Sequence, residues 1–398
     1  MKYELLSPAG DMEKLKTAIY FGADAVYCGG SALHLRAAQT DFTMEGLAEG
    51  IAYAHSKGKK IYITVNAFAR NDELDMLPEY VKSLKQMGAD AIIVSDLGVF
   101  AEAREAAPEL DIHISTQANI TNYKAALKWH ELGARRVILA RELTLDEIKE
   151  IRDKTPPELE IEAFVHGAMC MSYSGRCMMS AVLTGRDSNR GDCAQPCRWN
   201  YRLIEEKRPY ESYPVYETEE GMTILSSRDL CAIDFIDKLK EAGISSFKIE
   251  GRMKSPYYVA TVTNAYRKAL DGEADTDLLL KELKSASHRE FSSGFYFGRI
   301  KKEPPSKDGY MQDCIFIAMV LGQREDGLYK LEMRNRFALG ETLELLSPNS
   351  LDEEFRLEYI EDEDGAQIET VLHPQQLVYI KCPLKLSEGD ILRRRENN

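Results

Sequence analysis

Five cysteines of the chain follow one another at spacings that suit a metal or redox centre. Cys170, Cys177, Cys193 and Cys197 are separated by six, fifteen and three residues, and Cys231 follows after 33 more. Thiols stay reduced in the cytoplasm, where we expect this protein. Cysteines clustered in one segment are then more typical of a metal or cofactor site than of disulfides. An iron–sulfur cluster suits the irregular spacing, because each of its irons can accept a thiolate from a different loop.

Other chemistries of these thiols stay open. Zinc sites use close pairs such as C-x2-C, which are absent here, so zinc is less favoured. A radical S-adenosylmethionine site needs three cysteines spaced C-x3-C-x2-C. Cys193 and Cys197 match the first spacing, but no cysteine follows Cys197 at the second. Cys170 could instead be a nucleophile served by His166. The set could also be structural, as we expect for the isolated cysteines Cys28, Cys314 and Cys382, which suit small buried hydrophobes.

The apolar patterns of eight segments predict buried strands, and patterns typical of helices separate most of these segments. Several helical patterns end in a glycine before an apolar, β-branched run, as at Gly88 and Gly133. Alternating strands and helices indicate a parallel sheet, and eight units indicate a closed (β/α)8 TIM-like barrel, with an open doubly wound sheet as the alternative. The expected strands are 3–9, 25–29, 61–67, 91–96, 111–117, 136–142, 160–167 and 246–251.

The cysteines fall in a long insertion, 168–227, after the seventh strand. Loops that follow barrel strands form the mouth where active sites lie. We expect a helix to start near Asp229, with Cys231 in its first turn. The expected domains are the barrel with this insertion (1–272), a helical extension and linker (273–307) and a small C-terminal all-β barrel (308–398). The acidic run 361–365 suits a solvated hairpin tip.

Polar residues at the predicted strand ends should converge on a ligand. A buried Glu162 could equally be half of a salt bridge, and Arg36 could be a solvated loop residue. A carboxylate or phosphate would suit an arginine at such a strand end. The candidate catalytic residues are Glu162, His166, Gln117 and Asn66, and the candidate residues for binding a cofactor or co-substrate are Arg252, Glu250, Arg36 and Arg141.

The insertion also carries arginines interleaved with aromatic residues. The net charge of −14 argues against wholesale wrapping of nucleic acid, but a local basic patch can still grip single-stranded RNA. Guanidinium groups hold phosphates and aromatic rings stack on unpaired bases. An arginine-rich loop that only solubilises the insertion is the alternative. The candidates are Arg186, Arg190, Arg198 and Trp199, with Arg176, Arg202, Arg208, Tyr173 and Tyr201 nearby.

Several protein classes find no support in the sequence. Neither a signal peptide nor an apolar run of eighteen residues is present, so we expect a cytoplasmic protein without a membrane partner. His130 begins HELGA, which lacks the second histidine of a zinc protease helix, and G-x-S-x-G does not occur.

The cysteine segment resembles the signature of the collagenase-like peptidase family of unknown catalytic type, number 32. The matching residues are Glu162, Phe164, Gly167, Ala168, Met169, Cys170, Gly175, Cys177, Met179 and Ser180. RGDCAQPCR (190–198), SPAGD (7–11), STQ (115–117) and KIEGRMKS (248–255) extend the resemblance across the barrel. RNRFALGETLELLSP (334–348) resembles the TrhP-type branch, which hydroxylates the wobble uridine of tRNA.

The resemblance implies an activity that differs from the family's name. It implies an oxygen-independent, prephenate-dependent tRNA uridine 5-hydroxylase with a 4Fe-4S cluster. Its ligands would be Cys170, Cys177, Cys193 and Cys231, with Cys197 as the spare. The implied partners are the anticodon loop of tRNA, a small carboxylate co-substrate and a paralogous or electron-donor protein. A collagenase-like peptidase and a non-catalytic RNA-binding protein remain the alternatives.

Overall fold

The computed structural model describes most of the chain and divides it into two compact units. The first unit comprises residues 1–19, 23–254 and 289–309, and the second comprises 20–22, 255–288 and 310–398. Each unit is described by itself. The described residues are 3–30, 42–170, 172, 176–188, 192–199, 202–204, 212–214, 228–298 and 310–396.

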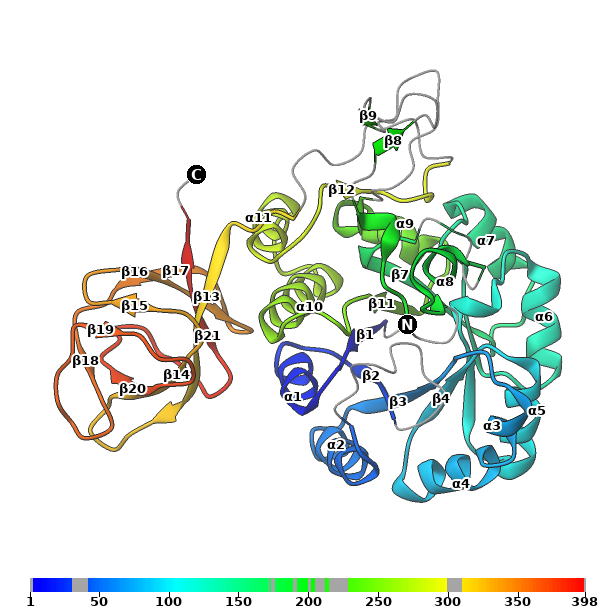
Figure 1. The fold of residues 1–398 in the computed structure, drawn as a ribbon, viewed down its shortest axis with the longest axis horizontal. Coiled ribbons are helices and arrows are strands. Elements are labelled where there is room, and N and C mark those ends of the chain that lie inside the picture. Colours follow the sequence, from blue (N-terminus) through cyan, green and yellow to red (C-terminus); the bar gives the residue numbers. More distant parts are fainter. Residues whose placement is uncertain are drawn as a thin grey trace. The chain divides into compact units, whose positions relative to one another are not determined.

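The first unit is built on a closed barrel of eight parallel strands (Figure 1). The last barrel strand pairs with both the first and the seventh, which closes the ring. This confirms the predicted (β/α)8 barrel and excludes the open sheet. The strands are β1 (Glu4–Pro8), β2 (Ala25–Gly29), β3 (Lys60–Val65), β4 (Ala91–Val94), β5 (Asp111–Ile114), β6 (Arg136–Ile138), β7 (Glu160–Ala168) and β11 (Ser246–Ile249).

Helices of the first unit connect these strands, and local sequence sets their ends. Thr144 caps one helix with Glu147 as a capping box, in which each side chain accepts a hydrogen bond from the other residue's backbone N–H. Gly88 ends another in the left-handed region (φ 92°). None of the described helices is long and apolar enough to cross a membrane. They are α1 (Met12–Tyr20), α2 (Met44–Ser56), α3 (Asn71–Leu74), α4 (Leu77–Met87), α5 (Leu97–Ala106), α6 (Tyr123–Glu131), α7 (Leu145–Asp153) and α9 (Ile236–Glu241), with 3-10 turns η2 (Thr116–Ala118) and η5 (Ile233–Phe235).

The chain returns from the cysteine-bearing insertion as a strand, not as the helix we expected near Asp229. This strand, β10 (Asp229–Cys231), runs antiparallel to β7 and places Cys231 opposite His166. Asp229 is buried in an ion pair with Arg289, whereas the first turn of a helix would have left it accessible. Within the insertion lie α8 (Met179–Thr184), η4 (Pro196–Arg198) and the hairpin strands β8 (Arg202–Ile204) and β9 (Ser212–Pro214); β12 (Phe291–Ser292) pairs with β10.

The second unit combines two helices with an antiparallel all-β region, as predicted for the C-terminal part. Ser255 and Asp275 cap α10 (Pro256–Asp271) and α11 (Thr276–Ser285). The sheet runs in the order β17-β16-β21-β13-β14-β20-β18 over an apolar core. Its strands are β13 (Cys314–Gln323), β14 (Tyr329–Met333), β16 (Thr342–Ser347), β17 (Ser350–Arg356), β18 (Ile360–Glu361), β20 (Leu377–Ile380) and β21 (Ile391–Arg395), and β15 (Phe337–Ala338) pairs with β19 (Thr370–Val371).

Two details of this β region bear on the sequence predictions. Residues 363–367 are exposed beside β18, so the end of the acidic run 361–365 forms a solvated tip, whereas Glu361 is only 5% exposed and pairs with Arg324. β21 was not predicted, yet it lies between β13 and β16 and carries the buried Arg393. Arg393 pairs with Glu282 at 2.6 Å and with Glu344 at 2.9 Å. The arginine-rich segment 393–395 therefore forms an interior strand, because Glu282 and Glu344 neutralise the buried Arg393.

Candidate functional site

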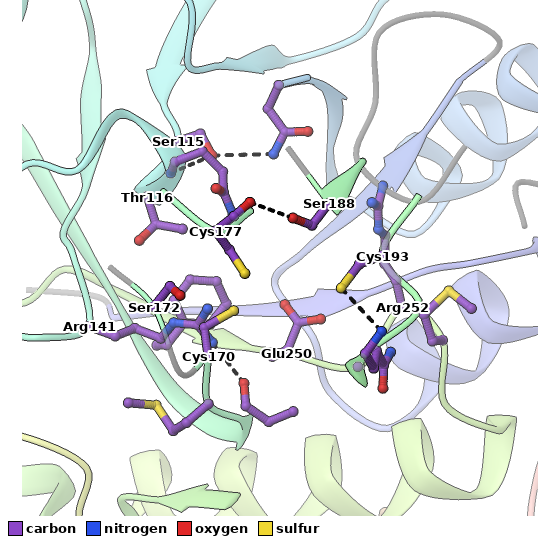
Figure 2. Close-up of a pocket in the computed structure, with 18 of the residues that line it drawn as sticks. Ser115, Thr116, Arg141, Cys170, Ser172, Cys177, Ser188, Cys193, Glu250 and Arg252 are labelled. Atoms are coloured by element: carbon purple, nitrogen blue, oxygen red, sulfur yellow. Dashed lines mark hydrogen bonds between the residues drawn. The ribbon is translucent and has the colours of Figure 1, made fainter. Parts of the chain in front are cut away.

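A cavity of about 160 Å³ opens at the C-terminal mouth of the barrel, between the strand ends and the insertion. Residues that follow β3, β5, β6 and β11 form one part of its wall. The insertion forms the rest, with the cysteines among its lining residues (Figure 2). All of this lies within the first unit. The expectation that the insertion and the strand ends meet at the mouth is therefore met.

Four thiols line this one cavity: Cys170, Cys177, Cys193 and Cys197. Figure 2 shows the side chains of the first three, from separate turns of the insertion, reaching into the same space. Two hydrogen bonds shape these turns: Ser188 Oγ donates to the Cys177 carbonyl (2.8 Å), and the Gln195 N–H donates to Cys193 Sγ (3.4 Å).

The donor set consists of thiols, the ligand type that iron–sulfur clusters take. In the part of the chain that the structure describes, no three His, Cys, Asp or Glu side chains gather closely enough to hold one ion. A four-iron cluster needs no such meeting point, because each thiolate binds its own iron at a corner of the cube. Four thiols around one cavity meet that requirement in chemical type and in number.

The fourth predicted ligand, Cys231, does not lie on the cavity wall. It is only 5% exposed on β10, while Cys197 lines the cavity. The geometry thus groups Cys197 with the other three thiols. The choice between the two cysteines as a ligand stays a prediction.

Of the three isolated cysteines, Cys28 and Cys314 are buried and Cys382 is half-buried. Burial raises the pKa of Cys28 to about 12 and those of Cys314 and Cys382 to about 11. A thiol that stays protonated is neither a good nucleophile nor a good metal ligand. These three residues are the small hydrophobic groups that the sequence predicts.

Two of the predicted anion-binding arginines line the cavity. Arg141 donates to the Ala168 carbonyl (2.7 Å), and its guanidinium lies 5.0 Å from the centre of the Phe164 ring. Its buried Nε has no hydrogen-bond acceptor among the described residues. Arg252 is 9% exposed and donates to Thr64 Oγ1 (2.9 Å). Arg36 lies outside the described residues.

Glu250 reaches the cavity because a glycine lets two strands approach. The Glu250 N–H donates to the His166 carbonyl (2.9 Å), at an irregularity in the pairing of β7 with β11. Gly167 has φ 106°, and a Cβ there would lie 2.5 Å from the Glu250 carbonyl oxygen. Only glycine accepts both the conformation and the contact.

Asn66 and Gln117 lie on the same wall and share one hydroxyl. Ser115 Oγ accepts hydrogen bonds from Asn66 Nδ2 and from the Gln117 N–H, both at 3.2 Å. Ser95 Oγ donates to the Asn66 carbonyl (2.8 Å). The ends of β3, β4 and β5 are thereby tied into one polar wall.

Glu162 and His166 do not line the cavity, contrary to the expected placement at strand ends. Glu162 is the third residue of β7 and is fully buried, bonded to Arg136 (2.9 Å) and Lys248 (3.0 Å). The salt-bridge alternative describes it correctly. His166 is 2% exposed and packs edge-on against Phe291 at 5.4 Å, because β7 turns there to pair with β10.

Lys248 lines the cavity but was missed in the sequence. A signal for it existed, since Ser246, Lys248 and Glu250 alternate with Phe247 and Ile249. Period-two alternation in a barrel strand places the polar set on one face, which here points inward. Four cations, Arg141, Lys248, Arg252 and Lys254, line the cavity with the carboxylate of Glu250. The described wall is therefore cationic in a chain whose net charge is −14.

The RNA candidates are described only in part. Trp199 is 46% exposed, and the exposed Arg186 pairs with Asp192 at 2.7 Å. Arg190 and the side chain of Arg198 lie outside the described residues. Three apolar side chains of the insertion are also exposed and were not singled out in the sequence: Met178, Val182 and Leu183.

Comparisons with known proteins match this chain over both of its parts. Peptidase family U32 matches residues 10–305, and the Peptidase family U32 C-terminal domain matches 312–393. The chain is 40% identical to tRNA hydroxylation protein P1 of Bacillus subtilis, over 99% of this chain and 95% of that protein. It is 36% identical to tRNA hydroxylation protein P of Escherichia coli, over 97% of this chain and 95% of that protein. It is also 39% identical to the 23S rRNA 5-hydroxycytidine C2501 synthase of Escherichia coli, over 68% of this chain and 39% of that protein. The chain therefore belongs to peptidase family U32 and fits the branch whose members carry the name tRNA hydroxylation protein P.

Proposed function

We propose that this protein is an RNA hydroxylase that converts the wobble uridine of tRNA to 5-hydroxyuridine, without oxygen and with prephenate as co-substrate. One observation carries the proposal: four thiols and a cationic wall meet in a single cavity at the mouth of the barrel. The names of relatives that match nearly the whole chain supply the reaction class.

A 4Fe-4S cluster would be held by Cys170, Cys177 and Cys193, with Cys231 or Cys197 as the fourth ligand. When bound, the cluster supplies electron transfer or Lewis-acid chemistry at the cavity. The chain's own residues provide the surroundings. The cationic wall offsets the negative charge that four thiolates bring, and Phe164 and Tyr27 limit access of water.

Prephenate carries carboxylates, which suit guanidinium groups at the end of a barrel strand. Arg252 is anchored by Thr64, and Arg141 is anchored by the Ala168 carbonyl. Both are thus held before a ligand arrives, which lowers the entropy lost on binding.

The tRNA would be gripped outside the cavity by the insertion. The exposed Trp199 suits stacking on an unpaired base of the anticodon loop, and arginines of the insertion suit its phosphates. A paralogous or electron-donor protein remains part of the proposal. Replacing the C5–H of uridine by C5–OH removes two electrons from the base, so the proposal also requires a two-electron acceptor, which is the co-substrate or a redox protein.

A peptidase activity is the second candidate, and only the family name favours it. No histidine is among the residues that line the described cavity, and His166 packs against Phe291.

The decisive experiment combines anaerobically purified protein, tRNA from a strain that lacks 5-hydroxyuridine, prephenate and a redox mediator that can accept the two electrons removed from the uridine. Mass spectrometry of the nucleosides should detect 5-hydroxyuridine. Cys170→Ser, Cys177→Ser and Cys193→Ser should each lose the absorbance near 400 nm and the product together, because a hydroxyl binds such clusters poorly. Cys28→Ser is the matched control and should lose neither. Stoichiometric zinc in the anaerobic protein, or digestion of denatured collagen that survives in the Ser variants, would refute the proposal.

A further inference from the structure

Lys248 is a buried cation whose hydrogen-bonding capacity is mostly unused. Its side chain is 5% exposed, and its one acceptor among the described residues is Glu162, at 3.0 Å. The ammonium also lies over the Tyr27 ring (4.3 Å) and the Phe164 ring (5.5 Å). An ammonium has three N–H donors, and leaving donors unused is unfavourable unless another acceptor arrives.

A ligand in the cavity can reach this ammonium, because Lys248 lines the cavity while Glu162 lies fully buried beneath it. Arg141 lies over the same Phe164 ring and has an unused Nε. Two cations thus share one aromatic ring at the inner part of the cavity. An anionic oxygen on a small molecule with an apolar body fits such a place, since the rings contact the body and the cations contact the oxygen.

Glu162 binds the ammonium of Lys248, and hydrogen bonds from Arg136 and Ser246 fix its own position. Arg136 NH1 donates to Glu162 (2.9 Å) and to Glu4 (2.6 Å), and Ser246 Oγ donates to Glu162 (3.0 Å). Arg136 also binds Glu160 through Nε and NH2, at 2.8 and 2.6 Å. One oxygen of Glu162 faces Arg136 and Ser246, and the other faces Lys248, so the carboxylate cannot turn without breaking a bond.

We infer that Lys248 is a ligand-contacting cation that binds an anionic oxygen of the small co-substrate, and that Glu162 is a positioning residue that acts through Lys248. The inference rests on the proposed function for the identity of that co-substrate. A carboxylate of a small acid and a phosphate of RNA share the same recognition chemistry. The burial of Lys248 favours the small acid.

The test measures prephenate binding by calorimetry with the anaerobically purified full-length protein, separately from hydroxylation. Lys248→Met should raise the dissociation constant about tenfold or more, as expected for the loss of a charge-assisted hydrogen bond. Lys248→Arg, which keeps the charge, should recover part of the affinity. Lys268→Met is the matched control, because Lys268 is a buried lysine of the second unit that donates to the Pro348 carbonyl at 2.8 Å. It should lower thermal stability and leave prephenate affinity unchanged.

A double-mutant cycle tests the role of Glu162. Glu162→Gln should weaken prephenate binding in the wild-type background. In the Lys248→Met background it should change the dissociation constant less than twofold, because there is no ammonium left to position. An equal effect in both backgrounds would show that Glu162 does not act through Lys248.

The outcomes separate this inference from the proposed function. If prephenate binding depends on Lys248 but no 5-hydroxyuridine forms, the inference holds and the reaction assignment fails. If prephenate does not bind, or binds Lys248→Met as tightly as the wild type, the inference is wrong. Loss of tRNA affinity in Lys248→Met with unchanged prephenate binding would assign the cation to RNA phosphate, which also overturns it.

Discussion

Asp229→Asn should strongly destabilise the first unit. Asp229 accepts hydrogen bonds from Arg289 NH2 (2.7 Å), from Arg289 Nε (3.1 Å) and from the Arg289 backbone N–H (3.1 Å). Both side chains are 3% exposed. The amide removes the negative charge that faces the buried guanidinium and replaces one accepting oxygen with a donor. Breaking such a pair costs about 3–5 kcal/mol.

The expected loss corresponds to a fall in melting temperature of roughly 10 °C, at about 2–4 °C per kcal/mol for a unit of this size. Circular dichroism measures it, and hydrogen exchange of 228–235 should show that β10 opens first. Asp237→Asn is the control, since Asp237 is 80% exposed and pairs with Lys240 on the surface. Its loss should cost at most about 1 kcal/mol. Replacing both partners, as Asp229→Leu with Arg289→Met, should recover most of the stability.

The pH dependence follows from the same pair. Burial alone would raise the pKa of Asp229, but the Arg289 guanidinium lowers it below its ordinary value. The stabilisation is therefore complete above the pKa of the unfolded chain, about 3.9, and is lost as the pH falls through the lower folded value. The difference between wild type and Asp229→Asn should be constant near pH 7 and shrink only below about pH 4. A difference at pH 7 no larger than that of Asp237→Asn would refute this account.

Four further substitutions test the fourth cluster ligand, the RNA contact of Trp199 and the close approach of two strands at Gly167. Cys231→Ser should lose iron and Cys197→Ser should keep most of it if the predicted ligand set holds, and elemental analysis with the absorbance near 400 nm decides between them; the reverse result would assign the cavity-lining Cys197. Trp199→Ala should weaken tRNA binding by about 1–3 kcal/mol in a filter-binding assay if the exposed ring stacks on a base, and unchanged affinity would make it a surface residue. Gly167→Ala should shift the Glu250 backbone, since its Cβ would lie 2.5 Å from the Glu250 carbonyl oxygen; activity and melting temperature should both fall, and a fully active variant would show that the strands can separate freely.

The barrel was predictable because its strands are local signals. Five of them (β2, β3, β4, β6 and β11) are short apolar runs that follow a glycine at the end of a helix, and burial on both faces makes the runs nearly continuous. The thiols that share the cavity were predictable for the same reason, since a residue after a barrel strand must lie at the mouth.

The errors arose where tertiary contacts overrode local patterns. The segment at Asp229 is three residues long and becomes a strand only because β7 extends beyond the barrel to pair with it. β21 contains Arg393, Arg394 and Arg395, and the sequence analysis did not predict it as a strand. It is an interior strand because Glu282 and Glu344 neutralise Arg393 inside the unit. Local propensity does not encode partners that are distant in the chain.

Glu162 illustrates the same limit for function. Its position in the seventh strand was identified, but its height in the barrel depends on the register of β7 with β11, where Glu162 lies opposite Ser246. That register puts it one layer below Phe164 and Lys248, beneath the cavity. Barrel layers are usually filled by branched apolar side chains, and an ionic layer is often less stable than an apolar one of equal volume. The ionic layer is better explained by the cavity above it: Arg136 fixes Glu162, and Glu162 fixes the ammonium at the cavity wall. One layer of the barrel is thus ionic instead of apolar, and this layer holds the Lys248 ammonium where a ligand can reach it.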